Sequence, residues 1–427
     1  MRRINVRALW SSPFLLTAST RRCTVLTTQS AQLIRVTHRH KSCGIVGLPN
    51  VGKSALFNAL TQTQLAQSSN YPFTTIDPNT ASVSVIDPRL QRLAAIVRSA
   101  RCIFTQLTFV DIAGLISGAS KGAGLGSKFL SNIRDVSVIL HVLRCFDDTE
   151  IIHVNSKIDP IADMETVEAE LLLADIETLE KRLENANKKQ KVNKNEINSQ
   201  LRLELIEKCL KSLNSGIPII DLIFTKEEQP IIESLQLLTS KPVAFLCNVD
   251  ENSASKGNKY SELVEQNISK LNLNSTSTIN GIKINRYPRS VMTVCAQLES
   301  DAIAGFDSEE SRKEFLSLSN VSESSLDKVI QQSSIMLKQQ VYYTVGPQEA
   351  RAWIIHQGSD APTAAGKIHS DIQNGFINVE VIAYKDFIEH NGEEGARLAG
   401  KVRVEGKNYI VNDGDILNFR HNQTKSK

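Results

Sequence analysis

The chain has 427 residues, of which 41% are hydrophobic and 22% are charged, and its formal net charge is only +3. A chain of this length can bury a large core and is long enough for two or three domains. The small net charge gives no whole-chain case for nucleic-acid binding, so any basic surface must be local. The sequence has no run of about 18 uninterrupted apolar residues, so we expect a soluble globular protein with no membrane contact.

The first 41 residues have the composition of a targeting sequence. No acidic residue occurs before Asp77, and the leader is rich in Ser, Thr and Leu. Its basic residues are Arg2, Arg3, Arg7, Arg21, Arg22, Arg35, Arg39 and Lys41. This composition is typical of an organelle transit peptide and is too polar for a secretory signal. We therefore expect a mitochondrial matrix protein; a plastid protein, or a cytoplasmic protein with a basic arm or a misassigned start, is the alternative.

After the leader, short apolar runs alternate with helical stretches. The runs are CGIVG (43–47), SVSVI (82–86), LTFVD (107–111), SVILHVL (137–143), VAFLCN (243–248) and SVMTVCA (290–296). Continuous apolar runs separated by helices indicate a largely parallel sheet that is covered on both faces. The sequence therefore predicts an α/β core.

The first run leads into a glycine-rich loop that is followed by a helical stretch. The loop, Gly47-Leu48-Pro49-Asn50-Val51-Gly52-Lys53-Ser54, matches GxxxxGK[ST] with the preceding strand and following helix that the motif requires. Backbone N–H groups and the helix N-terminus of such a loop bind the phosphates of a nucleoside triphosphate. We expect phosphate binding by Asn50, Val51, Gly52, Lys53, Ser54 and Ala55. Lys53 should reach the β- and γ-phosphates, and the Ser54 hydroxyl should ligate Mg²⁺.

Two further segments fit a nucleotide switch. Asp111-Ile112-Ala113-Gly114 ends the third apolar run, where Asp111 would hold Mg²⁺ through water and the Gly114 N–H would sense the γ-phosphate. Lys53, Asp111 and Gly114 are therefore the candidate catalytic residues. Between the two motifs, NYPFTTIDPN should supply a second Mg²⁺ ligand, for which Thr75 is our choice and Thr74 the alternative.

The residue after this turn is Leu115, where many GTPases place a Gln that orients the attacking water. A hydrophobic side chain cannot polarise water. We therefore expect hydrolysis to be slow until another group, a partner or an ion completes the site.

Base selection also departs from the guanine-specific pattern NKxD. The run VAFLC is followed by Asn248-Val249-Asp250-Glu251, which lacks the Lys and has Glu at the fourth position. NKNE at 193–196 has no preceding strand, so we treat it as coincidence. Cys295-Ala296-Gln297 stands where a base-contacting loop belongs and is also altered.

Residues from about 157 to 215 interrupt the core with apolar residues at helical spacing. The two stripes are Leu172, Ile176, Leu179 and Leu183, then Leu203, Ile206, Leu210 and Leu213. The polar segment between them predicts an inserted hairpin of two antiparallel helices. Near its tip are Lys188, Lys189, Lys191 and Lys194. Such a cluster is usually a solvated helix end. The more specific alternative is that it binds the phosphate backbone of a nucleic acid.

A helix over 322–340 precedes a final segment in which strand and turn patterns predominate. From about Val341, RAWIIHQG, FINVEVIAY, KVRVEG and NYIV read as strands, and NGFI, EGKN and NDGD as turns. We expect a leader (1–41), a nucleotide-binding domain (42–340) and a small mixed β domain (341–424).

From about Cys43 to its end the chain resembles the Obg-like ATPases (YchF type), a branch of the translation-factor-related P-loop NTPases. The resemblance rests on GLPNVGKSALFNALT, NYPFTTIDPN, FVDIAGLISGASKGAGLGSKFLSNIRD, HVLRCFDD, METVEAELLLADIE, NVDE and YYTVGPQEARAWIIHQGSDAPTAAGKIHSDIQNGFINVEV. It implies a P-loop core with a coiled-coil insert and a C-terminal TGS domain of β-grasp fold. Departures are Ala55 where Thr is usual, Gln297 where Lys is usual, and the leader.

The resemblance also implies a function. The NxxE signature implies a preference for ATP, with adenine near Asn248 and Val249, and Asn50 is of the type associated with activation by K⁺. Association with ribosomes or ribosomal RNA is implied as well. We therefore expect a monomeric ATP-hydrolysing switch protein; a GTPase, or an ATP-gated RNA- or ribosome-binding module with incidental hydrolysis, is the alternative.

Overall fold

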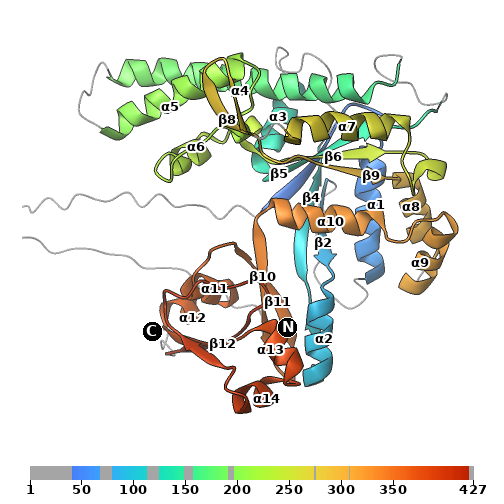
Figure 1. The fold of residues 1–427 in the computed structure, drawn as a ribbon, viewed down its shortest axis with the longest axis vertical. Helices are drawn as coiled ribbons and strands as arrows, with labels where there is room; N and C mark the ends of the chain where they lie inside the picture. The colour runs from blue at the N-terminus through green and yellow to red at the C-terminus, as the bar shows by residue number, and fades with distance from the viewer. Residues whose placement is uncertain are drawn as a thin grey trace, which may run out of the picture. The chain divides into compact units, whose positions relative to one another are not determined.

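The computed structural model describes residues 41–67, 79–112, 125–148, 157–190, 197–273, 276–306 and 308–422. The leader before Lys41 lies outside these residues, and the chain from His40 onward forms one compact unit. Within the described ranges, no helix is both long and apolar enough to cross a membrane. Figure 1 shows the arrangement of the helices and strands.

The six apolar runs all form strands of one sheet, so the predicted α/β core is confirmed. The strands are β1 (Ser42–Val46), β2 (Thr80–Val85), β4 (Thr105–Asp111), β5 (Val138–Arg144), β6 (Val243–Asn248) and β9 (Ser290–Val294). Their order is β2-β4-β1-β5-β6-β9, and every pairing is parallel except that of β2 with β4. The central strands β1 and β5 are buried along their whole length.

Helices cover both faces of this sheet. They are α1 (Lys53–Gln67), α3 (Leu125–Asp135), α7 (Lys259–Leu273), α8 (Ala296–Gly305), α9 (Glu309–Leu318) and α10 (Ser325–Met336). On β6, Ala244 and Leu246 pack in one apolar cluster with α1 and α10, whereas Phe245 and Cys247 pack in another with α7 and α8. Alternate side chains of a strand point to opposite faces, so the two clusters lie on the two sides of the sheet.

The helical insert consists of α4 (Pro160–Gln190) and α5 (Ile197–Asn214), which pack against each other. The second apolar stripe differs from the prediction, because Leu205 and Cys209 are buried beside Ile206 and Leu213, whereas Leu203 is outside the cluster. The same cluster includes side chains of η2 (Ile219–Asp221), α6 (Gln229–Leu235) and the hairpin β7 (Thr276–Ile279) and β8 (Ile282–Asn285). Two short 3-10 helices, η3 (Leu238–Ser240) and η4 (Glu251–Ser253), flank β6.

At the tip of the insert, Lys188 is exposed. Lys191, Lys194 and the side chain of Lys189 are outside the described residues.

The C-terminal domain is a second sheet with helices packed on it, as predicted. Its strands are β3 (Cys102–Ile103), β10 (Gln339–Val345), β11 (Ala350–His356), β12 (Phe376–Ile382), β13 (Arg403–Glu405) and β14 (Ile416–His421), in the order β13-β12-β14-β10-β11-β3. Its helices are α11 (Ala361–Ile368), α12 (Ser370–Asn374), α13 (Tyr384–Glu389) and α14 (Glu393–Leu398). The run NYIV is no strand: Ile410 forms only an isolated bridge with Asp360.

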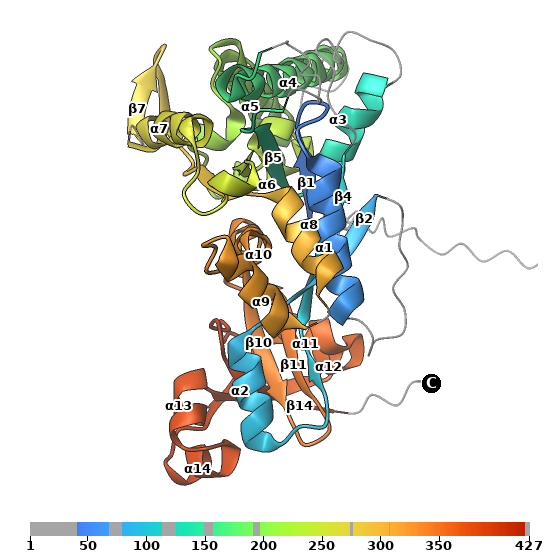
Figure 2. The same cartoon turned by 90° about the vertical axis from the view of Figure 1, so that its right-hand side faces the viewer.

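A segment from the front of the chain packs into the C-terminal domain. Figure 2 shows α2 (Pro88–Val97) beside β10 and β11, and its Leu90 and Leu93 are buried in one cluster with Tyr343 and Phe387. The following strand β3 extends the C-terminal sheet by pairing in parallel with β11. This packing sets α2 and β3 apart from the rest of the 42–340 span.

Candidate nucleotide site

The glycine-rich loop connects β1 to α1 and has an unusual backbone. Gly47, Asn50 and Gly52 have φ angles of +151°, +62° and +98°. A Cβ atom at Gly47 would lie 2.5 Å from the Val142 carbonyl oxygen, and one at Gly52 would lie 2.2 Å from Nδ2 of Asn248. Both positions therefore require glycine, because the backbone is in a region unfavourable for other residues and the space is filled.

Lys53 begins α1 and is enclosed by the loop that precedes it. The residue is only 7% exposed, and its Nζ donates a hydrogen bond of 2.7 Å to the carbonyl oxygen of Leu48. Burial lowers the pKa of the Lys53 ammonium, and the negative charge of Asp111 opposes this effect. The ammonium is thus held within the loop whose N–H groups are expected to bind phosphate.

Ser54 and Asp111 meet across the β1–β4 pair. Asp111 ends β4 opposite Ile45, and its Oδ2 accepts a hydrogen bond of 3.0 Å from the Ser54 hydroxyl. Its Oδ1 is buried and has no hydrogen-bond partner among the described residues. A buried, unpaired carboxylate oxygen is unfavourable unless a cation or its water completes it. Together with the adjacent Ser54 oxygen, it fits the donor set of Mg²⁺, which prefers carboxylate, hydroxyl and water oxygens.

Asn248, at the end of β6, ties the phosphate loop to the loop after β9. Its Nδ2 donates a 3.0 Å hydrogen bond to the Val51 carbonyl oxygen, and its Oδ1 accepts one of 3.1 Å from the Ala296 N–H. The side chain is 6% exposed. Asn248 therefore fixes two loops of the site relative to each other.

The next three residues have different environments. Val249, at the position of the Lys in NKxD, is 3% exposed and packs with Cys145 and Cys295, and its N–H donates to the Val294 carbonyl. Asp250 caps η4 by accepting hydrogen bonds from the backbone N–H and hydroxyl of Ser253. Glu251 is exposed.

The structure brings most of the predicted site residues to one edge of the sheet. Lys53, Ser54, Asp111 and Asn248 follow or end the strands β1, β4 and β6, whose carboxyl ends meet there, as expected of a parallel sheet. Ala55 is partly buried against the core. Thr74, Thr75, Gly114 and Leu115 are outside the described residues.

His141 is a residue near this site that the sequence did not reveal. It lies on β5, is 1% exposed, and its ring packs against Phe245 with centroids 5.6 Å apart. Burial, aided by the charge of Lys53, lowers the pKa of His141 to about 3. The imidazole is therefore neutral at physiological pH and adds no charge beside Lys53. Within the apolar run SVILHVL, no signal distinguishes it from an ordinary core position.

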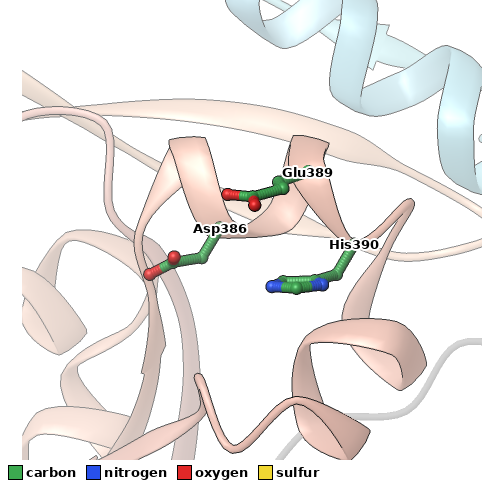
Figure 3. A group of neighbouring side chains, drawn as sticks. All are labelled: Asp386, Glu389 and His390. Carbon is green, nitrogen blue, oxygen red and sulfur yellow. The ribbon is translucent and has the colours of Figure 1, made fainter.

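Asp386 and Glu389 of α13 and His390, which directly follows it, form a separate cluster whose ligand atoms lie within 4.8 Å of one another (Figure 3). The Lys401 ammonium lies 3.4 Å from the Asp386 carboxylate and Glu389 is exposed. Because a positive charge already neutralises one of the three ligands, we assign no metal to this cluster.

The fold and the site define a P-loop NTPase. Residues 42–248 match the family model described as 50S ribosome-binding GTPase, and residues 339–422 match the model of the YchF GTPase C-terminal domain, described as a protein of unknown function. The chain belongs to the YchF family, as its resemblance to the Obg-like ATPases predicted.

Relatives match nearly the whole chain after the leader. The ribosome-binding ATPase YchF of Haemophilus influenzae Rd is 45% identical over 380 residues, which cover 89% of this chain and 99% of that protein. The protein of the same name from Bacillus subtilis 168 is 44% identical over 387 residues, with the same coverage. The solved structure of the Schizosaccharomyces pombe YchF GTPase superposes with a TM-score of 0.78 at 36% identity, covering 90% of this chain and 98% of that one.

Proposed function

We propose that this protein binds and hydrolyses ATP as a nucleotide switch that acts with ribosomes. Its bacterial relatives are named ribosome-binding ATPases. The observation that carries the choice of ATP is the loop after β6, where the Lys position of NKxD is held by the buried Val249. The fourth position, where an Asp would accept two hydrogen bonds from guanine, is held by the exposed Glu251.

Each residue of the site has a role in this proposal. The N–H groups from Asn50 to Ala55 and the Lys53 ammonium bind the phosphates, and adenine lies near Asn248 and Val249. Ser54 and Thr75 would hold Mg²⁺, and Asp111 would orient its water. When bound, the ion would supply positive charge that stabilises the phosphate groups. The Gly114 N–H senses the γ-phosphate, so that its loss on hydrolysis changes the loop that follows.

The test is a calorimetric titration of the purified protein with ATP and with GTP in the presence of Mg²⁺. We expect clear binding of ATP and weaker binding of GTP, and the variant Lys53→Ala should lose ATP binding. A preference for GTP would overturn the choice of base. Co-sedimentation with ribosomes in a non-hydrolysable ATP analogue and in ADP tests the partner, and equal absence of binding in both states would overturn it.

We also propose that K⁺ activates hydrolysis through Asn50. Asn50 lies in the phosphate loop at φ +62°, a left-handed conformation that Asn tolerates and Gly adopts freely. The variant Asn50→Gly therefore removes the side chain without straining the loop. We expect faster hydrolysis in K⁺ than in Na⁺ at equal ionic strength for the natural protein, and no difference for the variant. Equal rates in both salts for the natural protein would contradict the proposal.

For residues 1–41 we propose mitochondrial import, supported by their acid-free, Arg-rich composition. A fusion of these residues to a fluorescent protein should enter isolated mitochondria and be protected from added protease. The same fusion with its arginines replaced by glutamine is the control. Uptake by plastids only, or by neither organelle, would refute the proposal.

A further inference from the structure

The carboxyl end of α3 is held by a single ammonium group. The Lys241 Nζ donates hydrogen bonds of 2.7 and 2.8 Å to the carbonyl oxygens of Ile133 and Arg134, and a third to that of Val136. The last carbonyl groups of a helix have no partner within the helix and carry its partial negative charge. Lys241 therefore satisfies them with three donors and an opposite charge.

Lys241 directly follows η3, and η3 is bound to the insert. Asp175 of α4 accepts hydrogen bonds of 2.9 and 2.8 Å from the backbone N–H groups of Leu238 and Thr239, and one of 2.7 Å from the Thr239 hydroxyl. Its side chain has no exposed surface. Burial raises the pKa of Asp175, and the hydrogen bonds from Thr239 and Leu238 oppose this rise. A buried carboxylate with three donors fixes the position of η3 along α4.

A second connection joins α3 to α4 without η3. The Arg134 Nη2 donates a 2.8 Å hydrogen bond to the hydroxyl of Thr178. Thr178 is three residues beyond Asp175, so both side chains lie on one face of α4. The polar contacts thus form a closed set from α3 through Lys241 and η3 to α4, and back through Thr178 and Arg134 to α3.

Apolar packing alone would hold the two helices less firmly. Val167, Leu171 and Ala174 of α4 share a buried cluster with Ile133 of α3. Such contact is non-directional, whereas hydrogen bonds to named backbone groups fix one register. The polar set therefore adds directional restraint where α4 meets the core.

We propose that Lys241, Asp175, Thr178 and Arg134, which we call the α3–α4 joint, transmit nucleotide state to the insert. The segment 113–124, which contains Gly114, runs directly into α3. Because the joint makes the end of α3 and the middle of α4 one rigid body, a change in that segment moves the insert. Without the joint, the same change is absorbed between the helices. This inference rests on the proposed nucleotide switch and deepens it. The four residues are positioning residues, since none contacts the phosphate site.

Hydrogen-exchange mass spectrometry on the full chain tests the joint, with a non-hydrolysable ATP analogue and with ADP. In the natural protein we expect nucleotide-dependent exchange in peptides of the phosphate loop, α3, α4 and α5. In Lys241→Met the difference should persist in the phosphate loop and disappear from α4 and α5. Lys241→Arg, which can still donate to the carbonyls, should restore it.

Two matched threonine variants on α4 distinguish a specific effect on the joint from a general loss of stability. The hydroxyls of Thr178 and Thr166 each donate to the carbonyl four residues earlier, and the Thr178 hydroxyl also accepts from Arg134. Thr178→Val should therefore reduce the insert's response, and Thr166→Val should leave it intact. An unchanged insert response in both Lys241→Met and Thr178→Val would overturn the joint, as would equal effects of the two Thr variants.

Calorimetric ATP binding by the same samples separates this inference from the proposed function. A natural protein that binds ATP but shows no nucleotide-dependent exchange in its insert overturns the joint alone. A natural protein that binds no ATP overturns the proposed function as well.

Discussion

Replacing Asn248 with alanine tests whether the β6 loop organises the phosphate site. The substitution removes the hydrogen bonds to the Val51 carbonyl and from the Ala296 N–H, both on residues that are at most 2% exposed. An unsatisfied buried backbone group costs about 1–3 kcal/mol, so the free energy of unfolding should fall by about 2–6 kcal/mol. Water that enters the vacated space and binds these two groups would keep the loss of stability near the lower end of this range.

The effect on ATP binding follows from the bond to Val51, because that bond helps to hold the phosphate loop. If its loss of about 1–3 kcal/mol must be recovered when ATP orders the loop, the dissociation constant rises about 5- to 150-fold. Urea unfolding and calorimetric titration with ATP and Mg²⁺ measure the two quantities separately.

Asn272 provides the matched control for this variant. Its amide also donates to and accepts from backbone groups, with hydrogen bonds of 2.9 and 3.1 Å to Arg289, but it lies on α7. Asn272→Ala should reduce stability and leave the affinity for ATP unchanged. The reasoning is refuted if Asn248→Ala binds ATP as tightly as Asn272→Ala does.

Three further predictions concern glycine, histidine and tyrosine positions. Gly52→Ala should abolish ATP binding, measured by calorimetry, because its Cβ would lie 2.2 Å from the Asn248 amide. Gly216 is the control, since it has φ +72° and open space around it. Gly216→Ala should lower the free energy of unfolding by only about 1 kcal/mol and bind ATP normally. The pKa of His141 is lowered to about 3, so between pH 7 and pH 5 its imidazole takes up a proton in the unfolded chain but not in the folded one. Acidification from pH 7 to pH 5 should therefore lower the free energy of unfolding by about 2 kcal/mol more in the natural protein than in His141→Gln. Urea unfolding at each pH measures this difference. Tyr343→Phe removes the hydrogen bond to the partly buried Asp87 carboxylate, so the free energy of unfolding should fall by about 1–3 kcal/mol and hydrogen exchange in α2 should become faster. Unchanged exchange would show that this bond does not hold α2.

Local patterns predicted the elements whose environment is uniform along their length. The central strands β1, β5 and β6 stand out because both their faces are buried, so they read as continuous apolar runs. The helices of the insert follow from the 3.6-residue period, but this period places Leu203 in the buried stripe, whereas the structure buries Leu205 there. Several apolar residues in LRLELIEKCL fit a helical period, and the partner that selects among them is distant in sequence.

Contacts between distant segments could not be predicted from the sequence. The phosphate loop was found because its chemistry is contained in eight consecutive residues, whereas the link from Asn248 to Val51 spans 197 positions. In the sequence, Lys241 is an ordinary lysine before a strand. Only the fold shows that its ammonium donates to the carbonyl groups at the end of α3. Likewise, α2 has the pattern of an ordinary amphipathic helix, and nothing local indicates that it packs in the C-terminal domain.

The connections on either side of the site suggest why these distant contacts matter for a switch. The segment with Thr75 continues into β2 and then α2, whose Leu90 and Leu93 are buried in the C-terminal domain. The segment with Gly114 continues into α3, which the joint binds to the insert. The segment expected to supply a Mg²⁺ ligand and the segment expected to sense the γ-phosphate therefore lead along the chain to different parts of the molecule. In the proposed switch, loss of the γ-phosphate therefore affects the C-terminal domain and the insert through separate segments. A variant of the joint should abolish the nucleotide-dependent change in hydrogen exchange of the insert, whereas that of α2 should persist.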